Sequence, residues 1–420
     1  MKKTYSKFDI QITGVGVSSA IGQGKSAFAQ GLLQGKTAFS VMQRPGRQFP
    51  SDTGDAQSAV TAYLGAEIDS LSIPETLPKR VLRTSSYSSQ VALTTLQEAW
   101  VDANLDEVDP QRIGLVVGGS NFQQRELVTI HDKYRDKPHF LRPNYAHLFM
   151  DSDLCGLCTE LFDIKGFAYT LGGASASGQV SILKAIEAVE SGNVDTCIAI
   201  GALMDLSYWE LQGFQSIGAM GSHQFSQQPE LACRPFDKER DGFIYGEMCG
   251  AVVVERASSI QRDGVEPYAR CLGGAIAMDG NRNPNPSLTG EISVIEQSLM
   301  QAGLKASDID YVNPHGTGSM IGDDIELKAI RHCGLEHAWL NTTKSIIGHG
   351  LSAAGTVEVI ATLLQMQASE LHPSVNLDNP MDCSYQWVKN QSVSHKLKKT
   401  LNLSFGFGGI NSALCLQNLK

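Results

Sequence analysis

Gly172-Gly173-Ala174-Ser175-Ala176-Ser177-Gly178 is the stretch around which the rest of this chain is organised. The apolar run Phe167–Leu171 precedes it and is typical of a strand. A long amphipathic segment follows it, and Gly192 stands where a glycine commonly ends a helix. The pattern therefore predicts that Ser175 lies in a tight turn, beside the unpaired amides and partial positive charge of a helix N-terminus. Such a turn can hold a nucleophile or stabilise an oxyanion, although a small-residue turn without chemistry has the same pattern.

Strand-like and helix-like segments alternate through the remaining sequence. Strands are predicted at 10–17, 113–119, 197–202, 251–255, 268–274, 309–312, 340–343, 401–405 and 411–416, and helices at 25–33, 83–105, 287–303, 323–333 and 352–371. We expect Gly14 and Gly16 to end the first strand, residues 40–78 to be dominated by loops, and residues 120–160 to hold a helical insertion. Alternating strands and helices favour an α/β fold with buried sheets.

A second small-residue turn, Ser352-Ala353-Ala354-Gly355, also follows a predicted strand and precedes a long helix. Two units of this kind indicate a duplicated strand–turn–helix arrangement. We therefore predict two similar halves, residues 1–258 with the Ser175 turn and residues 259–420 with the second turn.

Length and composition limit the classes of function. The 420 residues are sufficient for two units with their own cores, and a net charge of −10 argues against a nucleic-acid-binding surface. Lys79, Arg80 and Arg83 nevertheless predict a local basic patch. No stretch has the apolar length of a signal core or a membrane span, so we expect a cytoplasmic protein that is not bound to a membrane.

The nine cysteines are scattered, and in a cytoplasmic protein they are expected to be reduced thiols. Cys155 and Cys158 form a CxxC pair, which occurs in zinc sites and redox motifs. A second CxxC is absent from the sequence, and the flanking residues lack the pattern of a redox motif. We therefore predict two packed thiols and no metal site.

Five segments, in this order and spacing, resemble the β-ketoacyl-ACP synthases, the condensing enzymes of fatty acid and polyketide synthesis. They are GGASASG at 172–178, RPFDKERDGFIYGE at 234–247, DYVNPHGTGSMIGDDIE at 310–326, KSIIGHGLSAAGTVE at 344–358 and NLSFGFGGIN at 402–411. The resemblance implies a thiolase-like fold with five alternating α and β layers, and a homodimer. It also implies a substrate carried on the phosphopantetheine arm of an acyl carrier protein, with no cofactor of the enzyme's own.

The same resemblance implies roles for individual residues. His315 and His349 match the two family histidines, and Lys344 and Glu358 match a pair that we expect to orient His349. Phe407, between Gly406 and Gly408, matches the gate and an oxyanion donor, and Thr317 and Asn411 are expected to support the site. A core position is expected for Phe405, and structural roles are expected for Asp237, Arg240, Asp241 and Glu247.

The nucleophile turn departs from the family pattern, because Ser175 stands at the family's cysteine position and Gly173 at its threonine position. A helix N-terminus lowers a thiol pKa enough to give thiolate, whereas a serine hydroxyl needs a general base. Condensation through an acyl-cysteine is therefore disfavoured. Decarboxylation of a malonyl thioester needs only two N–H donors for the enolate oxygen, which His315 and His349 can supply as neutral rings.

These residues predict a malonyl-ACP decarboxylase that makes acetyl-ACP for polyketide biosynthesis. The protein resembles the decarboxylases of polyketide β-branching cassettes. Two alternatives stay open at this point. One is a non-catalytic partner like the chain-length-factor subunits, against which the retained histidines argue. The other is an acyltransferase or ketosynthase that uses Ser175 as a nucleophile.

Overall fold

The computed structural model describes residues 9–49, 62–221, 223–282 and 284–420. The middle of the predicted loop region at 40–78 lies outside these ranges. Within these ranges the protein forms a 12-stranded sheet. Its strands lie in one continuous order except β2 (Gly22–Gln23), which pairs with β1 outside that order. Its order is β14 (Gln386–Trp387), β12 (Trp339–Leu340), β11 (Tyr311–Asn313), β16 (Lys399–Gly406), β17 (Ile410–Asn418), β10 (Ala269–Met278), β1 (Ile10–Ser19), β9 (Met248–Arg256), β7 (Thr196–Gly201), β5 (Ile113–Gly118) and β6 (Phe167–Leu171).

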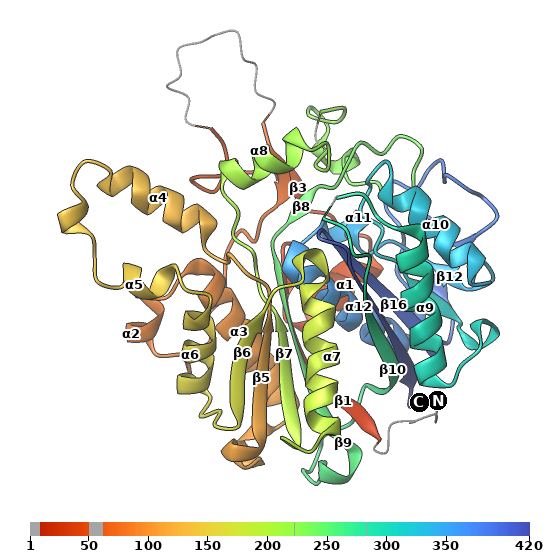
Figure 1. The fold of residues 1–420 in the computed structure, drawn as a ribbon, viewed down its shortest axis with the longest axis horizontal. Coiled ribbons are helices and arrows are strands. Elements are labelled where there is room, and N and C mark those ends of the chain that lie inside the picture. The colour runs from red at the N-terminus through yellow and green to blue at the C-terminus, as the bar shows by residue number, and fades with distance from the viewer. Residues whose placement is uncertain (1–8, 50–61, 222, 283) are drawn as a thin grey trace.

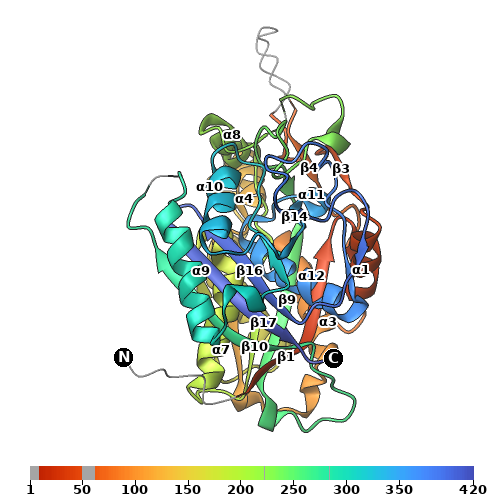
Figure 2. The same ribbon diagram turned by 90° about the vertical axis from the view of Figure 1, so that its right-hand side faces the viewer.

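Helices cover both halves of this sheet and also fill the space between them. On one side of the sheet, α3 (Tyr87–Asp102) packs on β1 and β9, and α6 (Ser152–Leu161) packs on β5 and β6. On the other side, α9 (Leu288–Ala302) covers β10 and β17, and α10 (Gly322–His332) packs against α9. Between the two halves lie α7 (Ser177–Glu190) and α12 (Ala354–Ala368), which contact each other and strands of both halves. Figure 1 shows this order of layers from left to right, and Figure 2 shows α9 lying along β17. The predicted five-layered, thiolase-like fold is confirmed.

The central helices approach each other closely because both carry glycine at the crossing. A Cβ atom at Gly178 would lie 2.6 Å from Oγ1 of Thr356, and one at Gly355 would lie 2.8 Å from the backbone nitrogen of Gln179. Both contacts are shorter than a carbon atom tolerates, so larger residues would force α7 and α12 apart. This crossing brings the Ser175 turn next to the turn at 351–353, as the contacts between the two turns show.

Two sequence predictions need correction. Strand β1 does not end at its glycines but runs to Ser19. Gly14 and Gly16 instead allow α3 to pack directly on the strand, because a Cβ atom at Gly16 would lie 2.0 Å from the carbonyl oxygen of Thr95. The predicted helix over 83–105 is shorter in the structure. Helix α3 starts after Ser86, whose side chain accepts a hydrogen bond from the Ser89 amide, and it ends at Asp102, while a separate short helix, α2 (Lys79–Leu82), precedes it.

The remaining elements surround this frame. They are α1 (Lys25–Leu33), β3 (Phe39–Val41), β4 (Leu64–Ala66), α4 (Gln124–Tyr134), α5 (Tyr145–Leu148), α8 (Tyr208–Ser216), β8 (Tyr245–Gly246), α11 (Lys344–Ile347), β13 (Glu370–Leu371) and β15 (Val393–Ser394). The helical insertion predicted at 120–160 is present as α4, α5 and α6. The division at residue 258 stays a prediction, and antiparallel pairing of β1 with β10 joins the two sides across it.

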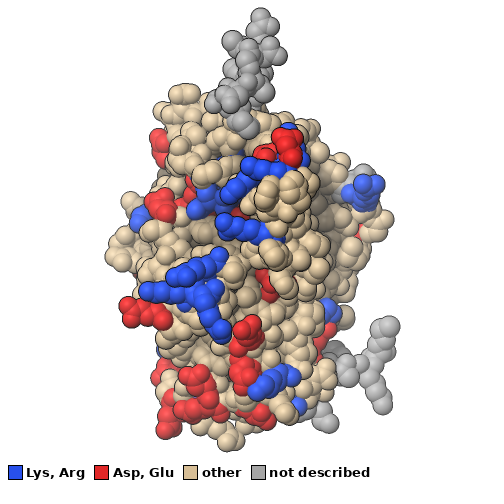
Figure 3. All heavy atoms as spheres, turned by 90° about the vertical axis from the view of Figure 1, so that its left-hand side faces the viewer, with Lys and Arg blue, Asp and Glu red and all other residues tan. Residues whose placement is uncertain are grey.

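The predicted basic patch at Lys79, Arg80 and Arg83 is part of a larger basic surface. Exposed basic residues lie on the face that carries α2 and α4, and Figure 3 shows Lys and Arg side chains gathered across its middle. They are Lys79, Arg80, Arg83, Lys133, Arg135, Lys137 and Arg142.

Cys155 and Cys158 are free, packed thiols in α6. Among the described residues no cluster of three metal-ligating side chains occurs, and no helix is long and apolar enough to cross a membrane.

Candidate active site

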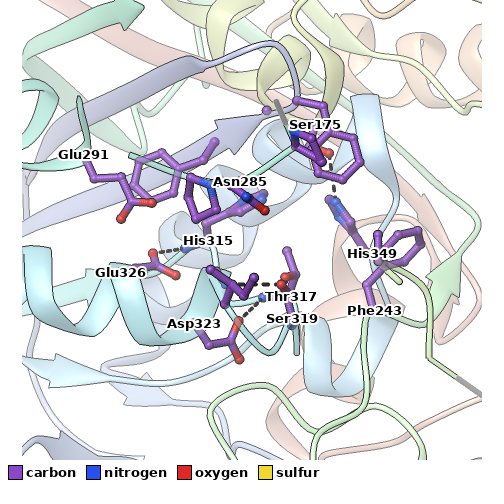
Figure 4. Close-up of a pocket in the computed structure, with 18 of the residues that line it drawn as sticks. Ser175, Phe243, Asn285, Glu291, His315, Thr317, Ser319, Asp323, Glu326 and His349 are labelled. Carbon is purple, nitrogen blue, oxygen red and sulfur yellow. Dashed lines mark hydrogen bonds between the residues drawn. The ribbon is translucent and has the colours of Figure 1, made fainter. Parts of the chain in front are cut away.

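Ser175, His315 and His349 line one pocket between the two halves of the sheet (Figure 4). They come from the turns after β6, after β11 and after α11. Four further predicted residues, Thr317, Gly406, Phe407 and Asn411, line the same pocket. Gly408, Lys344 and Glu358 do not line it, although the latter two support it from behind. The structure thus brings together the three residues predicted to be catalytic.

The Ser175 turn is a single turn of 3₁₀ helix that leads into α7. Ala174 has a left-handed backbone with φ of 45°, and Ser177 fixes the turn: its hydroxyl accepts from the Gly173 amide at 2.8 Å and donates to the Ala174 carbonyl at 2.7 Å. The Ser175 hydroxyl is then directed at His349, with Oγ 3.0 Å from Nε2. Figure 4 shows this hydrogen bond across the pocket.

His349 is held by the segment at 243–246, which belongs to the RPFD…YGE motif. Its backbone N–H donates to the Ile244 carbonyl at 2.8 Å, and its carbonyl accepts from the Gly246 amide at 3.2 Å. The ring of Phe243 meets the imidazole edge-on, with centroids 5.3 Å apart. This motif therefore positions a predicted catalytic residue. Its Glu247 has the structural role that we predicted, in buried ion pairs with Arg44 and Arg47.

The backbone of His315 is fixed by the side chains of Glu326 and Lys344. Glu326 accepts the amides of His315 at 2.6 Å and Gly316 at 2.8 Å. Lys344 Nζ donates to the His315 carbonyl and to Glu358 Oε1, each at 2.5 Å. We predicted that Lys344 and Glu358 pair and that they orient His349. The pair is present, but its direct contact is with His315, because the Lys344 side chain extends toward the end of β11.

Both imidazoles are neutral at physiological pH. Burial lowers the pKa of His349 well below its usual value, and the nearby Lys344 ammonium lowers it further. The pKa of His315 is lowered in the same way, first by burial, then by Lys344 and His349. The rings meet edge to face with centroids 5.4 Å apart. Nδ1 of each ring has no hydrogen-bond partner among the described residues, and a neutral ring carries a single N–H donor.

The glycine run at 406–409 passes close to the Ser175 turn. A Cβ atom at Gly406 would lie 2.5 Å from the carbonyl oxygen of Gly173, so only glycine fits there. Phe407 is 41% exposed at the pocket and contacts Phe214, which is compatible with the predicted gate. Phe405 is buried in the core as predicted, and its ring also packs on His315.

The two supporting residues make hydrogen bonds at the pocket wall. Asn411 Nδ2 donates to Asp279 at 2.7 Å, and the Thr317 amide donates to Asp323 at 3.1 Å. The sequence did not single out the pocket carboxyls Asp279, Glu291, Asp323 and Glu326. Asp323 and Glu326 lie within a quoted motif, whereas no local pattern distinguishes Glu291 from other acidic residues on helices. Among the described residues no cysteine lines the pocket.

Comparisons with known proteins agree with this architecture. Residues 7–259 match the family model described as beta-ketoacyl synthase, N-terminal domain, and residues 268–378 match its C-terminal domain. The chain is 57% identical over 412 residues to "Polyketide biosynthesis malonyl-ACP decarboxylase PksF" of Bacillus subtilis, covering 98% of this chain and 97% of that protein. It is 29% identical over 419 residues to "3-oxoacyl-[acyl-carrier-protein] synthase 2" of Coxiella burnetii, covering 98% of each.

Among solved structures, a beta-ketoacyl synthase from Burkholderia phymatum superposes with a TM-score of 0.87 at 24% identity, over 98% of this chain and 100% of that chain. A type II polyketide ketosynthase in complex with its acyl-carrier protein gives a TM-score of 0.85 at 23% identity, with the same coverage. These structures show the shared fold. From the matched family models and the near full-length relatives, this chain belongs to the beta-ketoacyl synthase family.

Proposed function

We propose that this protein decarboxylates a malonyl group held on an acyl carrier protein and releases acetyl-ACP for polyketide biosynthesis. The observation that carries the proposal is the pocket itself: two neutral histidines face a serine at the reactive turn. The relative that is 57% identical is named a malonyl-ACP decarboxylase of polyketide biosynthesis, which supports the same activity here.

The chemistry needs a place for negative charge and no nucleophile. When the malonyl carboxylate leaves as CO2, its electron pair moves into an enolate whose oxygen becomes negative. Nε2–H groups of His315 and His349 would donate to that oxygen, and each such donor is typically worth about 3–4 kcal/mol. Their lowered pKa values suit this role because a neutral ring donates without itself being acidic enough to lose the proton. Phe407 would cover the pocket with its ring, and its backbone N–H would be a further donor to the enolate oxygen.

Acylation of Ser175 is a second candidate, favoured by the 3.0 Å contact between its hydroxyl and His349. A serine–histidine pair is the arrangement of many acyl-enzymes. Two features weigh against it. His349 is a weak base because burial and Lys344 lower its pKa. In addition, Nδ1 of His349 has no hydrogen-bond partner among the described residues, so no carboxylate stabilises a protonated ring.

One experiment separates these activities. The protein is incubated with malonyl-loaded carrier protein, and the masses of carrier and enzyme are followed together. Decarboxylation converts malonyl-carrier to acetyl-carrier and leaves the enzyme mass unchanged. A stable acyl adduct on Ser175 would favour acyl transfer, and an unchanged malonyl-carrier would contradict both and favour a non-catalytic partner.

The assembly that we propose is a homodimer in the cytoplasm, without nucleic acid or membrane. Strand β6 lies at one end of the sheet, and Ala168 and Tyr169 on it are exposed. Phe167 and Tyr169 stack with centroids 5.6 Å apart. An exposed, partly apolar edge strand readily pairs with another strand. Pairing of β6 with its copy would continue the sheet across a two-fold axis.

For the carrier protein we propose docking on the basic face of α2 and α4. The phosphopantetheine arm bears an anionic phosphate, and the enzyme as a whole has a net charge of −10. A local cluster of Lys and Arg side chains therefore gives one face on which an anionic partner is attracted rather than repelled (Figure 3).

A further inference from the structure

The pocket carboxyls differ in how they are satisfied. Asp279 accepts a hydrogen bond from Asn411 at 2.7 Å. Asp323 accepts three backbone amides, and Glu326 accepts two. Glu291 accepts none from the described residues at Oε2, although its side chain is only 1% exposed. An unpartnered carboxyl oxygen at the wall of a reactive pocket requires an explanation.

Glu291 extends into the pocket from the first turn of α9, and the pocket wall includes it together with His315. Figure 4 shows its carboxyl group turned toward the side of the pocket on which His315 and Glu326 lie. Its own backbone amide is already used, because it donates to the Ser287 carbonyl at 2.9 Å. The side chain is therefore held by the helix backbone, while its acid group is free to meet a substrate.

The surroundings of the acid group favour its protonated form. Burial raises the pKa of Glu291 well above its usual value, and the neighbouring carboxyls of Glu326, Asp279 and Asp323 raise it further. The helix N-terminus acts in the opposite direction, but a first-turn carboxylate gains only about 0.3–1 kcal/mol there. Burying an unpaired carboxylate costs several times more, so the neutral acid is the stable form.

We propose that Glu291 donates the proton that converts the enolate into the acetyl group. This inference rests on the decarboxylase function proposed above. The bond between the malonyl methylene and its carboxylate breaks, CO2 leaves, and the electron pair stays on the enolate. The enolate carbon then forms a bond to the proton of Glu291, whose O–H electron pair remains on the carboxylate. Glu291 recovers a proton from solvent, so each turnover consumes one solvent proton.

Other groups at the pocket are poorer donors of this proton. The N–H groups of His315 and His349 are occupied by the enolate oxygen, and neutral imidazole is a very weak acid. The hydroxyl of Ser175 is also a far weaker acid than a carboxylic acid. Burial raises the pKa of Glu326 to about 8, but both of its oxygens already accept backbone amides, and these hydrogen bonds lower its pKa and favour the ionised form.

The test compares Glu291→Gln with Glu296→Gln. Glutamine keeps the shape of Glu291 but has no acidic proton, and Glu296 is an exposed residue of the same helix. We expect Glu291→Gln to slow decarboxylation of malonyl-carrier by about 100-fold or more, the lower range for a lost general acid. Glu296→Gln should react at the parent rate, and the melting temperatures of all three proteins should agree.

Two further measurements report on the proton itself. In D2O the parent should exchange the methyl hydrogens of acetyl-carrier for deuterium, since that exchange is the reverse of enolate protonation, and Glu291→Gln should not. The parent rate should also fall as the pH rises through the pKa of Glu291, because the ionised form has no proton to give. That decline should be absent from the residual rate of Glu291→Gln.

The outcomes separate this inference from the function on which it rests. A parent protein that leaves malonyl-carrier intact contradicts the decarboxylase function. An active parent whose Glu291→Gln variant keeps the full rate, the exchange and the alkaline decline contradicts the role of Glu291 alone. If Glu291→Gln does not fold, the parent decides the question, because an active parent without methyl exchange or alkaline decline overturns the proposal.

Discussion

The hydroxyl oxygen of Ser175 lies 3.0 Å from Nε2 of His349, although the two residues are 174 positions apart in the chain. This contact couples the helix-end turn of one half of the sheet to a histidine of the other. It also leaves two chemical roles for the serine. The hydroxyl either holds the imidazole in place for an enolate oxygen, or it is a nucleophile that the imidazole activates.

Substitution of Ser175 distinguishes these roles. Ser175→Ala removes the hydroxyl and keeps the backbone, so decarboxylation should stay within about tenfold of the parent rate, as for a lost hydrogen bond of about 1 kcal/mol. Ser175→Cys should place a thiol beside a helix N-terminus and accept an acyl group from acyl-carrier. CO2 release and enzyme mass are the measurements. An inactive Ala variant together with an acyl-Ser175 adduct on the parent would instead establish serine-based acyl transfer.

Loss of either histidine should slow decarboxylation by about 100-fold or more, the usual scale for one oxyanion donor. His315→Ala and His349→Ala are the variants, and rates with malonyl-carrier are the measurement. The lowered pKa values of both rings mean that they remain neutral as the pH falls from 8 to 6, so protonation of these rings should not reduce the parent rate over that range. Parent rates in both Ala variants would show that the enolate oxygen lies elsewhere.

Removing one partner of the buried pair of Lys344 and Glu358 should destabilise the protein more than replacing both partners. Burial raises the pKa of Glu358 to about 7, so Lys344→Met leaves a neutral buried acid that has lost its hydrogen-bond donor, which should reduce the free energy of unfolding by about 1–3 kcal/mol. Adding Glu358→Leu should restore most of that loss. Urea denaturation of the parent, single and double variants measures both effects. The double variant should decarboxylate more slowly than the parent even though its stability is restored, because the His315 carbonyl has lost its lysine donor.

The proposed dimer depends on the free edge of β6. Tyr169→Asp places a charge on each copy of this strand, and the two charges would face each other across the axis. We expect the variant to be monomeric by light scattering at micromolar concentration, where the parent is dimeric. Lys184→Asp, at a half-exposed position on α7, provides a control that should leave the dimer intact. A parent that is already monomeric would contradict the proposed assembly.

Carrier docking on the basic face predicts an effect on KM without an effect on kcat. The double variant Lys79→Glu and Arg80→Glu should raise KM for malonyl-carrier about tenfold or more. It should leave the reaction of a small malonyl-pantetheine thioester unchanged, because the pocket residues are untouched. Lys396→Glu, an exposed charge reversal in the loop before β16, is the control. An equal loss with both substrates would indicate damage to the pocket rather than to docking.

The sequence by itself determined the elements and the chemistry of their ends. Helix α9 could be predicted because Ser287 caps its start and Gly303 its end, and both signals are local. The turn before α7 could be proposed as a reactive site only together with the motifs at 310–326, 344–358 and 402–411, because a small-residue turn alone also occurs without chemistry. The loss of the cysteine, and with it the argument against condensation, is likewise visible in the sequence alone.

Tertiary structure decided which of these residues meet. Gly14 and Gly16 were expected to end a strand, but they permit α3 to pack on it, and only the position of α3 reveals this. Lys344 contacts His315 rather than His349 because its direction depends on how α11 lies against β11. Glu291 enters the pocket because α9 covers β10 and β17, a contact between distant segments. Local patterns fix φ and ψ over a few residues, whereas pockets form from packed surfaces whose geometry is set by the whole fold.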